Sequence, residues 1–286
     1  MAKKNDDVVI GPTGRPYNGF ATPAKLERHG PARIIALCNQ KGGVGKTTTS
    51  INLAASLAEY GRKVLAVDFD PQGALSAGLG INAHEGPTIY DLMLDTKRDA
   101  HDAIVPTAVE GLDIMPANID LSAAEVHLVN EVAREMILSR VLSKVAKEYD
   151  VILIDCQPSL GLLTVNALTA AHGVLIPLEC EFFALRGVAL LIETIEKVQD
   201  RLNPSLELDG LLATMYDSRT LHSREVLERI VETFGDRVFE TVIGRTVKFP
   251  DASVSGVPII DYAPQHPAAQ AYLRLARELV HRGAVA

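Results

Sequence analysis

A glycine-rich stretch with two lysines, at residues 41–48, most constrains what this chain can fold into. It reads KGGVGKTT, follows an apolar run at 34–38 and leads into a helical pattern at 46–59. Glycines let backbone N–H groups curl around an anion, and the new helix points its positive end at the same place. A strand, a glycine-rich turn and a helix in this order predict a phosphate-binding loop.

Two side chains of this loop have the chemistry of a nucleotide site. Lys46 can reach the outer phosphates, and the Thr47 hydroxyl can bind Mg²⁺. The usual pattern G-x-x-x-x-G-K-[ST] is not met in full, because Gln40 takes the place of the first glycine and a second lysine, Lys41, follows it. The predicted nucleotide-binding residues of the loop are Lys41, Gly42, Gly43, Val44, Gly45, Lys46, Thr47 and Thr48.

Strand and helix patterns alternate from residue 33 onward. With 286 residues, of which 47% are hydrophobic, the chain can bury a large core. The alternation predicts the α/β class, with a mostly parallel twisted sheet and helices on both faces. The expected strands are 34–39, 64–68, 112–116, 151–154, 173–177, 208–214 and 237–243, and the expected helices lie near 46–59, 122–147, 160–171, 183–202, 221–234 and 267–282.

The first 31 residues differ from the rest, because they are rich in turn-forming residues and have no apolar period. We predict that residues 1–31 form a flexible N-terminal tail and that 32–286 form one ATPase domain.

Carboxylates stand at the ends of two expected strands. Asp68 and Asp70 end the second strand, and Asp155 ends the apolar run at 151–154. Open α/β sheets bind their ligands at the carboxyl ends of the strands. One acid of the first pair can hold or activate an attacking water while the other supports the metal shell. Asp155 has the Walker B form, so Thr47 and Asp155 are the predicted Mg²⁺ ligands.

Basic residues late in the chain suggest a nucleic-acid contact. A net charge of −8 excludes a basic field over the whole surface, so any DNA contact needs a local patch. Arg219, Arg245 and Lys248 follow late strands and are the candidates for that patch. Met215, in the loop after the strand at 208–214, is expected to border the nucleotide base.

Membrane and secretory features are weak in this sequence. No apolar run approaches the roughly 18 residues of a membrane span. The helix at 267–282 could lie on a membrane, but its apolar face fits docking on the core better, so no stable membrane binding is expected. Cys38, Cys156 and Cys180 have no zinc-site spacing and suit the core of a protein in the reducing cytoplasm.

Four segments together resemble the ParA/Soj family of chromosome- and plasmid-partition ATPases, which have a deviant Walker A loop. They are KGGVGKTT at 41–48, DFDPQG at 68–73, IDCQPSLGLLTVNAL at 154–168 and TMYDSR at 214–219. The likeness covers residues 33–282. It departs at Gln157, where many members have proline.

The resemblance implies a sandwich dimer that binds Mg²⁺ and two ATP molecules between its subunits. Lys41 would reach the partner's phosphates, Lys46 would serve its own nucleotide, and Asp70 and Asp155 would be needed for hydrolysis. The dimer would bind double-stranded DNA without sequence preference, with Arg219 and Lys248 at the family's DNA-contacting positions. A ParB-like centromere-binding partner would stimulate hydrolysis. The protein would be cytoplasmic and associated with the nucleoid. The alternative is a MinD-like, membrane-associated ATPase that positions cell division.

Overall fold

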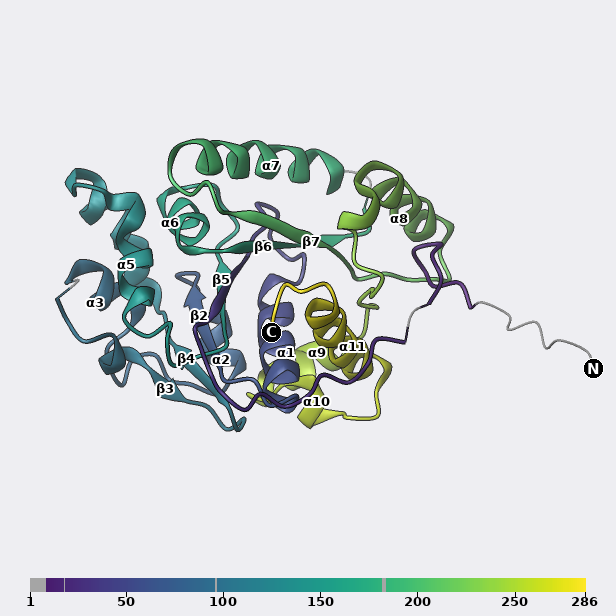
Figure 1. The fold of residues 1–286 in the computed structure, drawn as a ribbon, viewed down its shortest axis with the longest axis horizontal. Coiled ribbons are helices and arrows are strands. Elements are labelled where there is room, and N and C mark those ends of the chain that lie inside the picture. Colours follow the sequence, from purple (N-terminus) through teal and green to yellow (C-terminus); the bar gives the residue numbers. More distant parts are fainter. Residues whose placement is uncertain (1–8, 18, 96, 182–183) are drawn as a thin grey trace, which may run out of the picture.

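In the computed structural model, which describes residues 9–17, 19–95, 97–181 and 184–286, a single sheet runs between two layers of helices (Figure 1). Its strand order within these ranges is β3-β4-β2-β5-β1-β6-β7, and all neighbours are parallel except β3 and β4. The predicted α/β class is therefore confirmed. The strands are β1 Arg33–Leu37, β2 Val64–Phe69, β3 Val105–Pro106, β4 Leu112–Met115, β5 Val151–Cys156, β6 Gly173–Glu179 and β7 Glu207–Thr214.

Helices cover both faces of this sheet, so its central strands are apolar on both sides. In β1, Ile35 and Leu37 pack on one face while Ile34 and Ala36 pack on the other. The α-helices are α1 Lys46–Glu59, α2 Ala74–Gly78, α3 Ile89–Leu94, α4 Ala124–His127, α5 Ile137–Ser143, α6 Leu162–Ala170, α7 Ala184–Arg201, α8 Leu221–Phe234, α9 Lys248–Val254, α10 Ile259–Tyr262 and α11 Pro267–His281. The 3-10 helices are η1 Ala100–Ala103, η2 Ile119–Ala123, η3 Leu128–Asn130, η4 Arg134–Met136 and η5 Gly235–Arg237.

The C-terminal helix α11 docks on α1, as its apolar face predicted. Leu275 and Leu279 are fully buried, and the Tyr272 hydroxyl lies 3.2 Å from the Thr49 hydroxyl oxygen. Within the described ranges, no helix has the length and apolar character needed to cross a bilayer.

The helix expected at 122–147 is wrong, because this segment is broken into η2, α4, η3, η4 and α5. Leu128 and Ile137 are buried, but every residue from 129 to 136 keeps some exposure to solvent. Ala133 also has a left-handed backbone, with φ at 55°. A helix of this length is held mainly by the packing of one apolar face, and that packing is missing in the middle of the segment.

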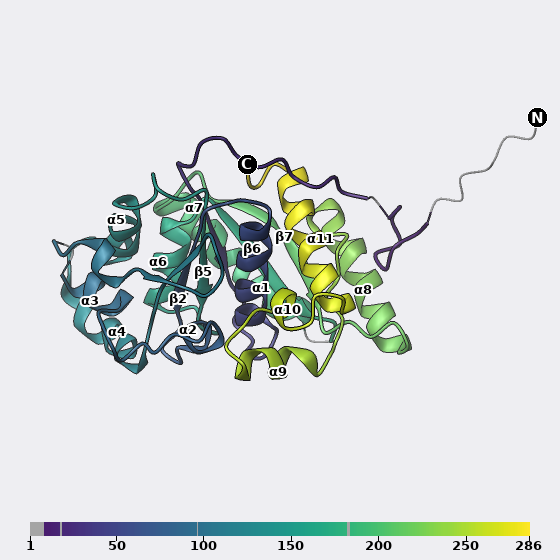
Figure 2. The same ribbon diagram turned by 90° about the horizontal axis from the view of Figure 1, so that it is seen from below.

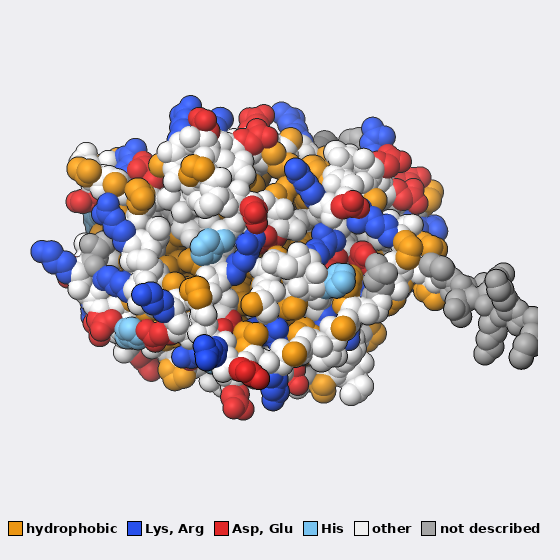
Figure 3. All heavy atoms as spheres, in the orientation of Figure 1, with side chains coloured by type: hydrophobic (Ala, Val, Ile, Leu, Met, Phe, Trp, Pro, Cys, Tyr) orange, Lys and Arg blue, Asp and Glu red, His pale blue; other side chains and the backbone are white. Residues whose placement is uncertain are grey.

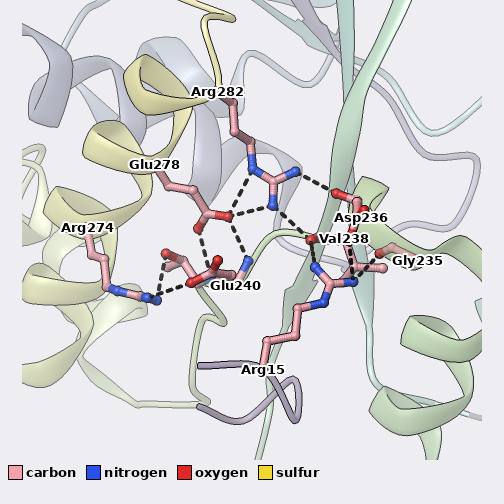
Figure 4. A network of polar contacts seen from close by, with 9 residues as sticks. Arg15, Gly235, Asp236, Val238, Glu240, Arg274, Glu278 and Arg282 are labelled. Carbon is pink, nitrogen blue, oxygen red and sulfur yellow. Dashed lines mark hydrogen bonds and ion pairs between the residues drawn. The ribbon is translucent and has the colours of Figure 1, made fainter. Parts of the chain in front are cut away.

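The strand expected at 237–243 is also wrong. The segment runs beside β7, where Phe239 N donates to Leu211 O and Ile243 N donates to Ala213 O, both at 2.9 Å. Two more of its backbone donors go to a side chain, because the carboxylate of Glu278 on α11 accepts from Glu240 N at 2.7 Å (Figure 4) and from Thr241 N at 2.9 Å. A regular ladder is therefore replaced by two bonds to β7 and an anchor on α11.

Glu278 is the centre of this anchor. Its carboxylate is fully buried and also pairs with Arg282 at 2.7 Å. Replacing Glu278 by alanine would leave the guanidinium and two backbone donors without their partner, so we expect a loss of about 3 kcal/mol in the free energy of unfolding. Urea denaturation followed by circular dichroism would measure the loss.

The matched control for this variant is Glu232→Ala on the exposed face of α8. Glu232 lies 3.8 Å from Arg229, and both side chains are largely exposed. Such a pair contributes little, so the control should change stability by less than about 0.5 kcal/mol. Equal stability losses in the two variants would contradict the anchoring role of Glu278.

The described part of the N-terminal segment, residues 9–17 and 19–31, lies along the α11 side of the domain (Figure 2). The Arg15 guanidinium donates to the carbonyl oxygens of Gly235 and Val238 (Figure 4). The Tyr17 ring lies 3.8 Å from the Arg274 guanidinium, and Phe20 is 7% exposed. Single aromatic and arginine side chains among turn-forming residues make these contacts. The periodicity of apolar residues therefore did not predict them. The flexibility of the segment and the domain boundary after residue 31 stay predictions.

Candidate nucleotide-binding site

The loop between β1 and α1 surrounds open space at the carboxyl edge of the sheet. Gly43 and Gly45 have φ values of 76° and 85°, which an L side chain rarely adopts. A side chain built on Gly42 or Gly43 would meet no atom within 4 Å. Gly45 caps α1 without any side-chain acceptor, so the first N–H groups of the helix are available to an anion. The loop therefore has the shape and the donors of a phosphate cradle.

Lys46 lies in this cradle with only 6% of its surface exposed. Its ammonium donates to the Lys41 carbonyl oxygen at 3.2 Å. Burial lowers the pKa of Lys46, whereas the nearby carboxylates of Asp155 and Asp70 favour its charged form. A phosphate in the cradle would add to that stabilisation of the charge.

Asp155 is the penultimate residue of β5 and lies directly behind the loop. Its fully buried carboxylate accepts from the Thr47 hydroxyl at 2.7 Å and the Ser50 hydroxyl at 2.9 Å. Burial raises the pKa of Asp155 to about 6, and the bonds from Thr47 and Ser50 oppose that rise. A carboxylate and a hydroxyl are oxygen ligands of the kind Mg²⁺ prefers, so the residues fit this metal. No group of three acidic, histidine or cysteine side chains in the described residues could hold a metal alone, so phosphate and water oxygens would complete its shell.

The two acids at the end of β2 have different surroundings. Asp68 is fully buried and accepts from the N–H of Ser76 at 2.8 Å and its hydroxyl at 2.7 Å. Burial, with a smaller contribution from Asp155, raises the pKa of Asp68 to about 7. Asp70 is half-buried and lines the cavity in front of the loop. Of this pair, only Asp70 borders the space where a phosphate would lie, and Asp68 fixes the turn into α2.

Two adjoining cavities make the site elongated. One, of about 230 Å³, lies at the loop and the other, of about 360 Å³, lies beside it, and they share Gly45, Thr48 and Met215. Met215 has a left-handed backbone, with φ at 52°. The smaller cavity is lined by Gly42, Gly43, Gly45, Lys46, Thr47, Thr48, Asp70, Pro158 and Met215. The larger adds the side chains of Thr214, Ile243, Phe249 and Tyr272, which suit the flat face of a base.

The Lys41 ammonium has different partners from the Lys46 ammonium. Its ammonium pairs with Glu181 at 2.6 Å and with Glu179, at the end of β6, at 3.0 Å. These hydrogen bonds raise the pKa of Lys41. Glu179 pairs with Arg245 as well, at 2.9 Å. The lysine that opens the loop therefore lines neither cavity, and carboxylates of its own chain hold its partly exposed side chain.

Comparisons with known proteins place this geometry in a family. A family model described as an AAA domain matches residues 32–208. The chain is 58% identical over 274 residues to an uncharacterized protein of Mycobacterium tuberculosis, covering 96% of this chain and 86% of that protein. It is 49% identical to the chromosome-partitioning ATPase Soj of Treponema pallidum, covering 87% of this chain and 98% of that protein.

The chain belongs to the ParA/Soj family of partition ATPases. A solved structure from Mycobacterium smegmatis, named cobyrinic acid a,c-diamide synthase and holding an ATP analogue and magnesium, is 42% identical, with a TM-score of 0.79 over 88% of this chain and 95% of that one. ATP and Mg²⁺ are the cofactors of this partition ATPase, and its loop, Thr47 and Asp155 are the groups that fit them.

The three predicted DNA-contacting residues of the ATPase all have acidic partners. Arg219 is bound by both carboxylate oxygens of Asp217, at 2.9 and 2.8 Å, and its side chain is otherwise exposed. Lys248 begins α9 and lies 3.6 Å from Asp251. Arg245 pairs with Glu179 and lines the larger cavity, so it lies nearest the nucleotide site. DNA phosphates would have to exchange with these carboxylates.

Several site residues of the ATPase escaped the sequence interpretation. Thr214 donates to the Val44 carbonyl oxygen at 2.8 Å and so ties β7 to the loop. Phe249 and Tyr272 pack edge to face, with ring centroids 5.8 Å apart, beside the larger cavity. Thr214 begins the TMYDSR segment, but no contact with the loop was expected of it, and Phe249 and Tyr272 belong to no motif. The three residues come from segments that only the fold brings together.

Proposed function

We propose that this ATPase uses ATP as a timer for DNA partition, as a dimer with two nucleotides sandwiched between its subunits. The observation that carries the proposal is the position of Lys41. It belongs to the phosphate loop, yet it lines neither cavity and its ammonium pairs with Glu179 and Glu181. A phosphate of a second subunit's nucleotide would compete for this ammonium better than one in the chain's own cradle, where Lys46 already lies.

In this cycle, dimerisation switches DNA binding on. Each subunit contributes Arg219, Arg245 and Lys248, and closure joins two weak sets of cations into one. In one subunit, DNA phosphates must compete with carboxylates that already pair with the three cations, so the monomer binds DNA poorly. The dimer binds more tightly because two sets of cations engage the same DNA. Phosphate contacts carry no sequence information, so the binding would be non-specific.

Hydrolysis then ends the DNA-bound state. We propose that Asp70, which borders the phosphate cavity, holds or activates the attacking water. Mg²⁺ bound through Thr47 and Asp155 would neutralise charge on the phosphates. Loss of the bridging phosphate frees Lys41 to return to Glu179 and Glu181, and the dimer opens. We propose that the turnover is slow and is stimulated by a ParB-like partner, with the protein on the nucleoid in the cytoplasm.

ATP-dependent binding to double-stranded DNA of arbitrary sequence tests this function. With six cations engaged per dimer, the affinity should fall about 10³-fold between 50 and 200 mM salt. Fluorescence anisotropy with labelled DNA, with ATP, ADP or no nucleotide, would measure both dependences. Equal DNA affinity with and without ATP would exclude the proposed use of ATP as a timer for DNA binding.

The name of the mycobacterial neighbour suggests a second candidate, an ATP-dependent amide synthesis on a corrin acid. Release of ADP that requires cobyrinic acid and an ammonia donor, rather than DNA or a partner protein, would favour this candidate.

A further inference from the structure

A pair of thiols without a function in the nucleotide cycle lies in the core of the molecule, whose surface in Figure 3 mixes basic, acidic and hydrophobic side chains. The sulfur atoms of Cys38 and Cys156 lie 3.2 Å apart. Both cysteines are free, and each is only 1% exposed. Two thiols in contact can be joined as a disulfide, so this pair is a candidate modification site.

The sheet itself brings the two thiols together. In the parallel pair of β1 and β5, Leu37 lies opposite Asp155, and one residue further along each chain are Cys38 and Cys156. Both side chains belong to the core on the same face of the sheet. Neighbouring strands lie about 4.8 Å apart, which falls within the Cα separations of about 4.4 to 6.8 Å that disulfides span. A bridge therefore needs no change of register, only an approach of the two sulfurs by about 1 Å.

The pair adjoins the two chemical parts of the nucleotide site. Cys156 directly follows Asp155, whose carboxylate accepts from the Thr47 hydroxyl at 2.7 Å, and Pro158 two residues later lines the cavity at the loop. Cys38 lies three residues before the phosphate loop begins at 41. A bridge would tie β1 to β5 where both of these parts begin. A shift of about 1 Å in groups that position the reactants can lower a rate by about 100-fold.

Solvent is close to both thiols although they are buried. On one strand Gln40 is half-buried and Lys41 is exposed, and on the other Gln157 is half-buried and Pro158 is exposed. Local opening of such strand ends requires much less free energy than global unfolding, and a small oxidant can enter during it. In a reducing cytoplasm, disulfides are usually transient and serve catalysis or redox sensing. A reversible bridge is therefore the form of oxidation that fits this position.

Hydrogen peroxide supplies the oxidising equivalents for such a bridge. One sulfur attacks a peroxide oxygen, the O–O bond breaks, and the departing hydroxide takes the proton of that thiol, which leaves a sulfenic acid and water. The second sulfur attacks the sulfenic sulfur, the S–O bond breaks, and hydroxide leaves with the second proton as water. The two thiols lose two electrons and two protons in total, and one peroxide becomes two waters. A dithiol reductant reverses the bridge by exchange.

We propose that Cys38 and Cys156 form a reversible disulfide in the presence of peroxide, and that this bridge lowers ATP turnover by shifting Asp155 and the phosphate loop. The inference goes beyond the proposed function, because neither DNA nor a partner protein takes part. It rests on that function only for ATP turnover as its second readout.

The first experiment maps the bridge by mass spectrometry on the full chain. The protein is treated with hydrogen peroxide without nucleotide, unfolded, alkylated with iodoacetamide and digested with trypsin. Cys38 is then on the peptide 34–41, but Cys156 and Cys180 share the peptide 148–186. The matched control is therefore Cys180→Ala, which replaces the third buried cysteine and leaves one possible link between the two peptides.

We expect the linked peptides in wild type and in Cys180→Ala, and their absence in Cys38→Ala. Cys156→Ala provides the same test if Cys38→Ala does not fold. Wild type that shows only free thiols, or only sulfenic, sulfinic and sulfonic acids, would overturn the proposal, because the pair would then be ordinary core packing. A link in Cys180→Ala that persists in Cys38→Ala would overturn it as well.

The second experiment measures ATP turnover before peroxide, after peroxide, and after dithiothreitol. Turnover of wild type and Cys180→Ala should fall at least about tenfold with peroxide and return with dithiothreitol. Turnover of Cys38→Ala should stay within about twofold of its starting value. An equal fall in Cys38→Ala, or unchanged turnover of protein that contains the linked peptides, would overturn the effect of the bridge on hydrolysis.

The two proposals fail separately in these experiments. Absence of ATP-dependent DNA binding in the wild type would remove the partition timer, whereas the linked peptides are detected without DNA or ATP. A wild type that binds DNA with ATP but forms no bridge would keep the proposed function and remove the redox site.

Discussion

Replacing Lys41 by alanine is expected to abolish ATP-dependent dimerisation and DNA binding while each subunit still binds ATP. The Lys41 side chain does not line the cavity at the loop, and the Lys46 ammonium bonds only to the Lys41 backbone carbonyl, so nucleotide affinity of the monomer should change little. Two charged contacts to phosphate, one from each subunit, would be lost, at about 1.5 to 3 kcal/mol each. The dimerisation constant should therefore weaken by at least about 100-fold. Light scattering with ATP and a filter-binding assay for ATP would measure the two effects.

A companion variant separates this role from a purely structural one. Glu181→Gln removes the charge of the carboxylate closest to the Lys41 ammonium, at 2.6 Å, but keeps the lysine. If Lys41 serves a second subunit, this variant should dimerise at the same or a lower ATP concentration than wild type. If both variants lose dimerisation, the Lys41–Glu181 pair is structural and the proposed mechanism is wrong.

The second large effect is expected for Asp70→Ala, which should bind ATP and stay on DNA. Asp70 borders the phosphate cavity but does not form the loop that binds phosphates. Loss of a group that activates or orients water typically lowers the rate by about 10²- to 10⁴-fold, so turnover should fall at least about 100-fold. Phosphate release and dissociation of labelled DNA, measured on the same preparation, should slow together.

Asp68→Asn is the contrasting variant for this prediction. Asp68 is fully buried against Ser76, so its replacement should first lower thermal stability by disturbing the turn into α2. Asp70→Ala, at a half-buried position, should melt within a few degrees of wild type. If the Asp70→Ala variant hydrolyses ATP rapidly, Asp70 has no part in hydrolysis, whatever the stability of the variant.

Local sequence was sufficient for the parts of the site that are continuous in the chain. Residues 41–45 form the loop before α1 and residues 46–48 begin that helix, because glycine conformation and helix start are set within a few residues. Asp155 lies near the end of β5 because a short run of Val, Ile and Leu between two helical patterns favours a buried strand. The same local interpretation failed for 122–147, where both ends of the segment pack on the core but residues 129–136 do not.

The sequence by itself determined that this chain has a phosphate loop with two lysines, acids at two strand ends and an α/β sheet. These depend on backbone propensity and on the period of apolar residues. Only the tertiary structure decided that Asp70 rather than Asp68 borders the cavity, since burial against Ser76 depends on packing. It also decided that Lys41 is held by Glu179 and Glu181, which are distant in sequence and reach it only because β6 lies next to β1.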